Sequence, residues 1–335
     1  MNLARFGLRL RPFRPTPDPQ SYYPATPHEF ALDRLARAVE DDEGLLLLAG
    51  DPGTGKTLLA HLLLERFGED VQSSLITNCR FATRADLLRT VLFDLNRPHQ
   101  GMGETELRLA LTEHLLGQFA EGKRTLLVFD EAQDLTPDLL EELRLLGNLE
   151  TARGKAVQIV LVGQPALLDT LRLPQLAVLN QRLPVRLRLE ALDVHESADY
   201  LLHQIKAAGG RPERIITDEA VRLIARNARG IPRLLNQAGH QALALAESLD
   251  AEQVDVEVVI EALAALGIEA EMETEAELTP PRLAEPDEMD EEGPHVMIGM
   301  QAGPEYNPPA RNDWPNEAYV KQQELPPQII YRPNH

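Results

Sequence analysis

Residues able to hold a phosphate chain stand together in one short stretch of the sequence. The stretch fits the pattern G-x-x-x-x-G-K-[ST], in which glycines let successive backbone N–H groups face phosphate oxygens. Lys56 in this pattern reaches the β- and γ-phosphates, and the Thr57 hydroxyl binds Mg²⁺. A helix expected to begin near Lys56 adds its positive end. The predicted nucleotide-binding residues are Gly50, Asp51, Pro52, Gly53, Thr54, Gly55, Lys56, Thr57 and Leu58.

Two adjacent carboxylates follow an apolar run further along the chain. Residues 126–129 are expected to form a buried strand, and Asp130 and Glu131 come directly after it. The carboxyl end of a central parallel strand lies beside the phosphate site. We therefore expect Asp130 to hold Mg²⁺ and Glu131 to act as general base toward the attacking water. Thr136 and Pro137 suit the N-cap and first residue of the next helix, which leaves both carboxylates at the strand end.

Three further polar residues stand where a site could use them. Gln164 follows an apolar, β-branched run and would place an uncharged amide beside the γ-phosphate; the alternative is a turn residue. Arg182 precedes the alternating segment 185–189 but lies outside its pattern of apolar and basic residues. Arg233 falls in the first turn of a predicted helix, where a cation opposes the helix dipole. A residue set against local preference often serves a site, so Arg233 could reach over the nucleotide; the alternative is a solvated side chain.

Alternating strands and helices must position these residues. Strands are expected at 73–77, 126–129, 156–163 and 185–189, in addition to the apolar run before the glycine-rich loop. Helices are expected at 84–95, 104–120 and 137–150. This alternation is typical of a three-layer α/β domain with a five-stranded parallel sheet, and the half-polar strand 185–189 suits an edge. After Leu192 four helical segments, at 193–210, 217–230, 231–248 and 255–267, predict an all-α lid.

Composition divides the chain into four segments. We expect a basic N-terminal arm at 1–20, an α/β core at 21–191, the lid at 192–267 and a disordered tail at 268–335. The tail has 15 acidic and 4 basic residues and 11 of the 25 prolines. A segment of this composition has too little apolar surface to offset the entropy of ordering it.

The same numbers restrict location and partners. The net charge of −20 argues against nucleic-acid binding through bulk charge. Cys79 is the single cysteine, so no intrachain disulfide forms, which fits a cytoplasmic protein. No apolar run approaches the roughly 20 residues that span a membrane.

Taken together, the motifs resemble the layout of the AAA+ ATPases, and within them the ExeA/GspA-type ATPases. Those are accessory ATPases of general secretion and pilus systems, related to transposition ATPases such as TniB. The resemblance covers about residues 10–266 and implies ATP and Mg²⁺ as ligands. It implies that Asp130 is the Mg²⁺ ligand, Glu131 the catalytic base and Gln164 sensor 1. It also implies that Arg233 is sensor 2 and Arg182 the arginine finger. The stretches that carry it include "LLLLAGDPGTGKT", "DEAQDLTPDLLEELRLLGNLE", "VQIVLVGQPALLDTL", "LNQRLPVRLRLEAL" and "GIPRLLNQ".

Three functions follow as expectations. The first is an ATP-hydrolysing switch or remodeller of a protein assembly, with secretion or the envelope as its candidate setting, that self-associates into a ring or an ATP-bridged oligomer. The second is a DNA-engaging ATPase of the transposition or loader type, and the third is a nucleotide-dependent scaffold. The acidic net charge favours the first, and the arginine-rich start weakly favours the second. Secretion members usually continue into a transmembrane helix and a peptidoglycan-binding part, whereas this sequence continues into the acidic tail. We therefore expect a cytosolic ATP switch that acts on a protein partner of unknown identity or on DNA.

Overall fold

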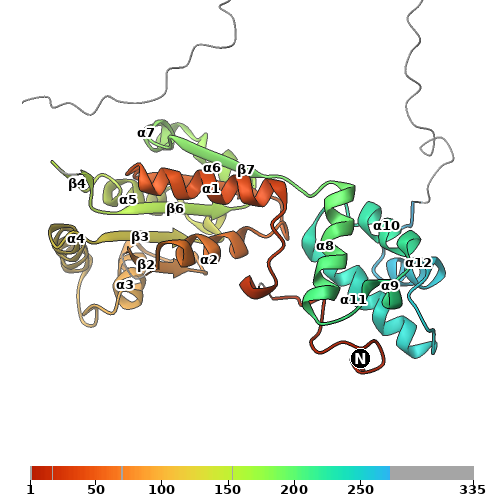
Figure 1. Cartoon of the computed structure of the whole chain (residues 1–335). Coiled ribbons are helices and arrows are strands. Elements are labelled where there is room, and N and C mark those ends of the chain that lie inside the picture. Colours follow the sequence, from red (N-terminus) through yellow and green to blue (C-terminus); the bar gives the residue numbers. More distant parts are fainter. Residues whose placement is uncertain (1, 17, 69–70, 153, 272–335) are drawn as a thin grey trace, which may run out of the picture. The chain divides into compact units, whose positions relative to one another are not determined.

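We analysed a computed structural model of the chain, which describes residues 2–16, 18–68, 71–152 and 154–271. All of these residues fall in one compact unit of the chain (Figure 1). The segment from residue 272 onward, which holds most of the tail expected to be disordered, lies outside the described residues. Among the described residues, no helix has both the length and the apolar character required to cross a membrane.

A five-stranded parallel sheet forms the first part of the chain, as the alternating pattern predicts. Its strands run in the order β2-β3-β6-β1-β7, so β1 lies between β6 and the edge strand β7. In the register of the sheet, Leu47 of β1 is paired with Leu161 of β6 and with Arg186 of β7. The strands are β1 (Leu45–Gly50), β2 (Val71–Ile76), β3 (Arg124–Phe129), β6 (Gln158–Gly163) and β7 (Val185–Leu189).

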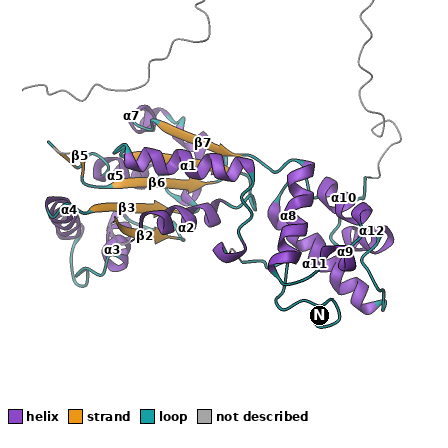
Figure 2. Cartoon of the chain, in the orientation of Figure 1, coloured by secondary structure: helices purple, strands orange, loops and turns teal. Residues whose placement is uncertain are grey.

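Helices cover both faces of this sheet, and the two-residue period of the strands decides which side chains meet them (Figure 2). Leu46 and Leu48 belong to the apolar cluster with α1 and α2, whereas Leu45 and Leu47 belong to the cluster with α3, α4 and α5. The helices and helical turns of this part are η1 (Pro19–Ser21), α1 (Thr26–Glu40), α2 (Lys56–Phe67), α3 (Arg84–Asp94), α4 (Glu104–Ala120), η3 (Ala132–Asp134), α5 (Pro137–Leu146), α6 (Ala166–Leu171), η4 (Pro174–Leu176) and α7 (Ala177–Gln181).

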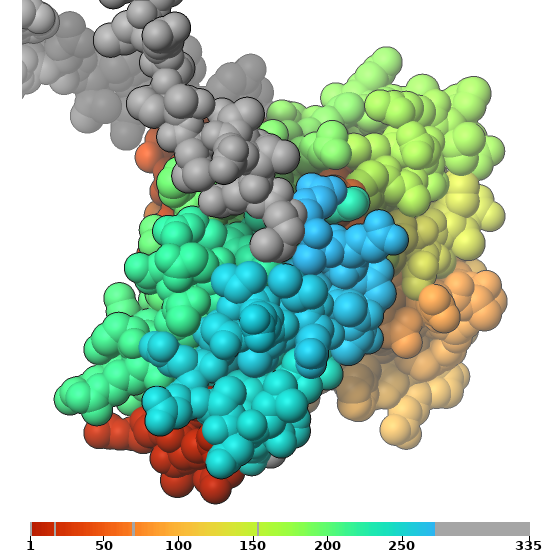
Figure 3. Space-filling model, turned by 90° about the vertical axis from the view of Figure 1, so that its right-hand side faces the viewer, coloured from red at the N-terminus to blue at the C-terminus, as the bar shows by residue number. Residues whose placement is uncertain are grey.

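The second part is helical and also includes the N-terminal stretch. Phe6, Leu8 and Phe13 are buried in the same apolar cluster as the helices after Leu192. Phe13 packs so closely on α11 that a Cβ at Gly239 would lie 2.7 Å from its ring. The first residues, expected as a basic arm, thus lie against the helical part (Figure 3). Its helices are α8 (Val194–Ala207), α9 (Pro212–Ile215), α10 (Asp218–Asn227), α11 (Pro232–Ser248) and α12 (Val256–Ala265).

One segment differs from the expected helix at 137–150. The helix α5 ends at Leu146, and the chain continues into a short antiparallel hairpin of β4 (Glu150–Thr151) and β5 (Gly154–Lys155). Gly147 follows α5, and a Cβ on this residue would lie 3.3 Å from the Leu45 side chain of β1. The chain therefore turns at the point where it meets the core of the sheet. The apolar period of the helix continues past this point, and for that reason sequence periodicity alone placed its end too late.

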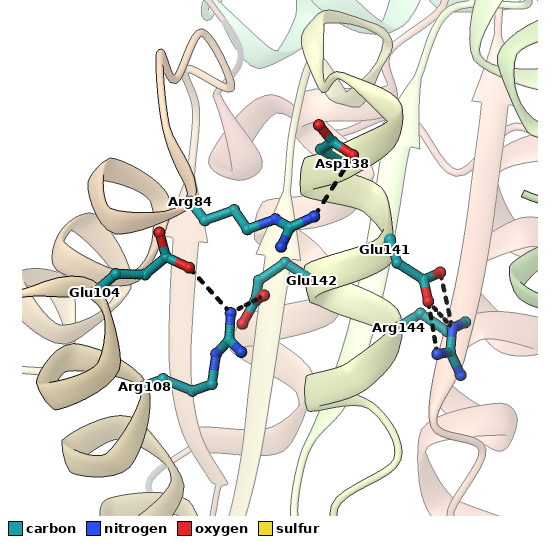
Figure 4. Close-up of polar contacts among 7 residues, drawn as sticks. All are labelled: Arg84, Glu104, Arg108, Asp138, Glu141, Glu142 and Arg144. Carbon is teal, nitrogen blue, oxygen red and sulfur yellow. Dashed lines mark hydrogen bonds and ion pairs between the residues drawn. The ribbon is translucent and has the colours of Figure 1, made fainter. Parts of the chain in front are cut away.

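An ion-pair network joins α3, α4 and α5 on one side of the sheet (Figure 4). The Arg108 guanidinium on α4 donates to Glu142 on α5 and lies within 3.4 Å of Glu104. The carboxylate of Glu142 is buried at 1% exposure, and burial raises its pKa despite the attraction of Arg108. Arg84 at the start of α3 pairs with Asp138 at the start of α5. These contacts hold the helix that follows Asp130 and Glu131 to its two neighbours.

Candidate functional site

The glycine-rich loop between β1 and α2 has a backbone that only glycine fits. Gly53 and Gly55 have φ angles of 85° and 101°, in the left-handed region that disfavours side chains. A Cβ at Gly53 would lie 2.7 Å from the Cβ of Arg233, and a Cβ at Gly55 would lie 2.8 Å from Nε2 of His28. The loop is therefore enclosed by α1 on one side and by α11 on another.

The Lys56 ammonium is held at the inner face of this loop. It donates to the backbone oxygens of Gly50 and Asp51, each at 2.9 Å. Burial lowers the pKa of Lys56, and the carboxylates of Glu131 and Asp130 act against that shift. A cation held by the loop and faced by two carboxylates is placed to meet the phosphates of a nucleotide.

The two residues expected to hold Mg²⁺ lie in contact. The Thr57 hydroxyl at the start of α2 donates to Oδ2 of Asp130 at 2.6 Å. The backbone of Asp130 is fixed on both sides, since its N–H donates to Ile76 of β2 and its carbonyl accepts from the thiol of Cys79. A hydroxyl and a carboxylate are the hard oxygen ligands that Mg²⁺ takes in proteins, so these residues fit the ion.

Glu131 and Gln164 come together from neighbouring strands. The Gln164 amide donates to Oε2 of Glu131 at 3.3 Å. A third residue, Gln133, donates to the same oxygen at 2.6 Å. Glu131 itself has φ 56° and ψ 38°, a left-handed conformation that is uncommon for a residue with a side chain.

One pocket collects most of the predicted residues. Arg233 lines it from the first turn of α11, and its backbone N–H donates to the carbonyl of Gly53 at 3.2 Å. Asp130 lies behind Thr57, and Gly50, Asp51 and Thr54 form the part of the loop away from the pocket lining. The predicted residues that line the pocket are Pro52, Gly53, Gly55, Lys56, Thr57, Leu58, Glu131, Gln164 and Arg233.

Arg182 is the predicted site residue that lies elsewhere. It follows α7, is exposed, and its guanidinium donates to the side chain of Asn148 beyond the end of α5. It does not line the pocket of its own chain. The geometry thus separates Arg182 from the other predicted residues.

The far half of the pocket comes from residues that sequence reasoning missed. His28 of α1 is buried and its Nε2–H donates to the carbonyl of Thr54 at 2.8 Å. The Tyr200 hydroxyl of α8 donates to Asn236 of α11 at 3.0 Å, and Asn236 in turn donates to the carbonyl of Arg14. No spacing or charge run marks these residues, because they meet only when the N-terminal segment lies between the loop and the helical part. The pocket residues before α1 are Arg14, Pro15, Thr16, Asp18, Ser21, Tyr22, Tyr23 and Ala25.

Comparison with known proteins supports a nucleotide site. A family described as an AAA domain matches residues 39–171, the segment that holds the loop, both carboxylates and Gln164. General secretion pathway protein A of Aeromonas hydrophila is 37% identical over 239 residues, which are 71% of this chain and 43% of that protein. The Holliday junction branch migration complex subunit RuvB of Thermotoga petrophila is 25% identical over 68% of this chain and 60% of that protein. The chain thus spans about half the length of these curated relatives.

Solved structures share the fold. Cdc6p from Pyrobaculum aerophilum superimposes with a TM-score of 0.60 at 20% identity, covering 84% of this chain and 75% of that one. The ORC1 protein of Aeropyrum pernix, solved in complex with DNA, gives a TM-score of 0.58 at 20% identity over 76% of this chain and 69% of that one. At this identity the likeness concerns the arrangement of the sheet and helices.

Proposed function

We propose, from the premise that this chain belongs to the AAA+ P-loop ATPases and is similar to general secretion pathway protein A, that it is an oligomeric switch driven by Mg²⁺-ATP. The observation that supports this most directly is the pocket in which Lys56, Glu131 and Arg233 face one space. In this proposal the nucleotide triggers assembly with a neighbouring subunit, and hydrolysis resets the assembly.

The residues have distinct tasks in the proposed reaction. A water oxygen bonds to the γ-phosphorus, the bond from that phosphorus to the bridging oxygen breaks, and ADP and phosphate leave. Glu131 accepts the proton of the water, and Gln164 orients it. Lys56 and Arg233 compensate the charge of the phosphates from the two sides of the pocket. Thr57 and Asp130 would hold Mg²⁺, which would neutralise part of the phosphate charge when bound.

The position of Arg182 supports the oligomeric part of the proposal. A guanidinium compensates transition-state charge only when it reaches the γ-phosphate, and Arg182 does not line its own pocket. An exposed arginine at the sheet edge can enter the pocket of a second subunit instead. We therefore propose that Arg182 acts as a finger in trans.

A protein assembly is the partner that we favour, in the cytoplasm, where the single thiol Cys79 stays reduced. The similarity to general secretion pathway protein A and the net charge of −20 support it. The alternative is a DNA-engaging ATPase, which the similarity to RuvB favours. Binding to duplex DNA over a series of salt concentrations separates the two. A steep loss of affinity with salt would indicate phosphate contacts, and no binding at low salt would oppose the DNA function.

The decisive experiment is hydrolysis by Glu131→Gln. This variant should bind ATP with an affinity close to wild type. Its turnover should be slower by a factor of about 100 or more, because it lacks the base. Lys56→Ala should instead lose binding itself. Nucleotide affinity is measured by titration with a fluorescent ATP analogue and turnover by phosphate release. Wild-type turnover by Glu131→Gln would refute the assignment of the base.

A further inference from the structure

The side-chain amide of Gln133 connects the proposed base to the strand that holds the proposed sensor. Its nitrogen donates to Oε2 of Glu131 at 2.6 Å, and its oxygen accepts from the backbone N–H of Gln164 at 3.0 Å. One planar amide therefore contacts residues that follow two different strands, β3 and β6. Sequence patterns indicate roles for Glu131 and Gln164 but none for Gln133.

Glycine at the end of β6 makes this contact possible. A Cβ at Gly163 would lie 3.0 Å from Oε1 of Gln133 and 3.3 Å from its backbone nitrogen. Gly163 is buried within the sheet, so the amide has little room to move aside. The turn η3 and the left-handed backbone of Glu131 bring Gln133 back toward the base that precedes it by two residues. The arrangement thus depends on two backbone features outside Gln133.

The hydrogen bonds constrain the proposed base in a specific way. Both amide nitrogens, those of Gln133 and Gln164, donate to the same oxygen, Oε2 of Glu131. Among the described residues, none donates a hydrogen bond to Oε1. A carboxylate held by one oxygen presents the other to solvent in a fixed direction, where it can take a proton from water. The Gln133 amide donates to Glu131 with its nitrogen and accepts from Gln164 with its oxygen.

We propose that Gln133 is a positioning residue for hydrolysis, which holds the Glu131 carboxylate and couples its orientation to the end of β6. The proposal rests on the function proposed above, in which Glu131 is the base. In it, a shift of Gln164 on contact with the γ-phosphate is passed through Gln133 to the base. Gln133 touches neither water nor nucleotide in this scheme, and it acts through Glu131.

Two substitutions at Gln133 test this role. Gln133→Leu removes both hydrogen bonds at similar volume, and Gln133→Met removes both at similar side-chain length, neither adding a charge beside Glu131. Each should lower kcat about 10- to 100-fold, as expected for loss of a hydrogen bond to a charged group. The dissociation constant for ATP and the Tm should stay close to wild type, because the loop is untouched. Gln118→Leu on α4, which does not line the pocket, is the matched control.

Gly163→Ala reaches the same contact without changing a polar group. Its methyl group would lie 3.0 Å from both the Gln133 amide oxygen and Cδ2 of Leu167, so it presses on this contact, and we expect kcat to fall while ATP affinity is kept. Wild-type kcat in both Gln133 variants, with slow turnover by Glu131→Gln, would overturn the inference and leave the proposed function standing. Equal losses in affinity and kcat would also overturn it, since they indicate a general defect of the site. If Glu131→Gln hydrolyses ATP like wild type, the proposed base and this inference both fall. Should Gln133→Leu fail to fold, the unbranched Gln133→Met decides.

Discussion

Glu131 has a left-handed backbone conformation that costs free energy, and this conformation directs its side chain into the pocket. Non-glycine residues in the left-handed region are strained by about 1–3 kcal/mol each and gather at functional sites. The φ angle of 56° turns the chain away from β3 directly after Asp130, so adjacent carboxylates face different partners. Asp130 meets Thr57, and Glu131 meets the two amides. The left-handed conformation thus separates Asp130, the proposed Mg²⁺ ligand, from Glu131, the proposed base.

His28 provides a prediction at the same scale. Its bond to the carbonyl of Thr54 requires a hydrogen on Nε2, and its Nδ1 is buried without a partner. Burial lowers the pKa of His28, although the hydrogen bond to Thr54 and the charges of Glu196 and Glu29 oppose the shift. The unfolded chain therefore binds this proton more readily than the folded one, and the contribution of neutral His28 to stability is lost as pH falls below about 6.5.

We expect the Tm of wild type to fall more steeply between about pH 6.5 and pH 5 than that of His28→Gln. Glutamine can also donate to the Thr54 carbonyl but has no proton to gain. His99→Gln, which replaces an exposed histidine, should keep the wild-type slope. Thermal unfolding over a pH series measures this, and parallel curves for wild type and His28→Gln would contradict it.

At the scale of elements, α5 connects the site to the sheet edge. It begins shortly after the site at Pro137 and ends near Asn148, the residue that Arg182 contacts. The ion pairs of Arg108 and Arg84 hold α5 against α4 and α3. Movement of α5 would therefore affect both ends of the proposed reaction, the base of one subunit and the finger offered to the next.

Removal of Arg108 tests the strength of this support. Arg108→Ala leaves the buried Glu142 carboxylate without its cation, and we expect a loss of roughly 3 kcal/mol in the free energy of unfolding. The loss should become smaller as pH falls and the unpaired carboxyl group takes a proton. Arg172→Ala, which removes an exposed pair with Asp169, should change stability by less than about 0.5 kcal/mol. Denaturant unfolding measures both, and equal effects would show that burial of Glu142 is unimportant.

At the scale of the whole molecule, the separation of Arg182 from the pocket makes self-association a requirement of the proposed function. Arg182→Ala should keep ATP binding and lose about 100-fold or more in turnover. Mixing it with Glu131→Gln should restore activity, since the second variant still offers its finger to the first. Phosphate release is measured across mixing ratios. A second mixture, of Arg182→Ala with Lys56→Ala, shows whether the subunit that donates the finger must itself bind ATP, because Lys56→Ala keeps Arg182 but should not bind the nucleotide. Full turnover by a strictly monomeric wild type would contradict the finger in trans.

Local patterns predicted the five strands because each is a run of apolar or alternating residues bounded by turns. They also placed the glycine-rich loop, Asp130, Glu131 and Gln164 at strand ends. The end of α5 and the hairpin of β4 and β5 escaped prediction, since the helix stops where Gly147 meets the sheet. The burial of Phe6, Leu8 and Phe13 escaped it too, because arginines dominate the composition of that stretch.

The sequence by itself indicated the candidate residues: a glycine-rich loop, two carboxylates at a strand end, an amide and two arginines, with their proposed roles implied by the family resemblance. Only the tertiary structure decided which of these meet. The order β2-β3-β6-β1-β7 places β6 beside β3, and this brings Gln164 to Glu131. Packing of α1 on the sheet brings His28 to the pocket, packing of the N-terminal segment on the helical part brings Asn236 to it, and Arg182 is left outside. Contacts between distant segments depend on how apolar faces pack, and a linear pattern does not specify that packing.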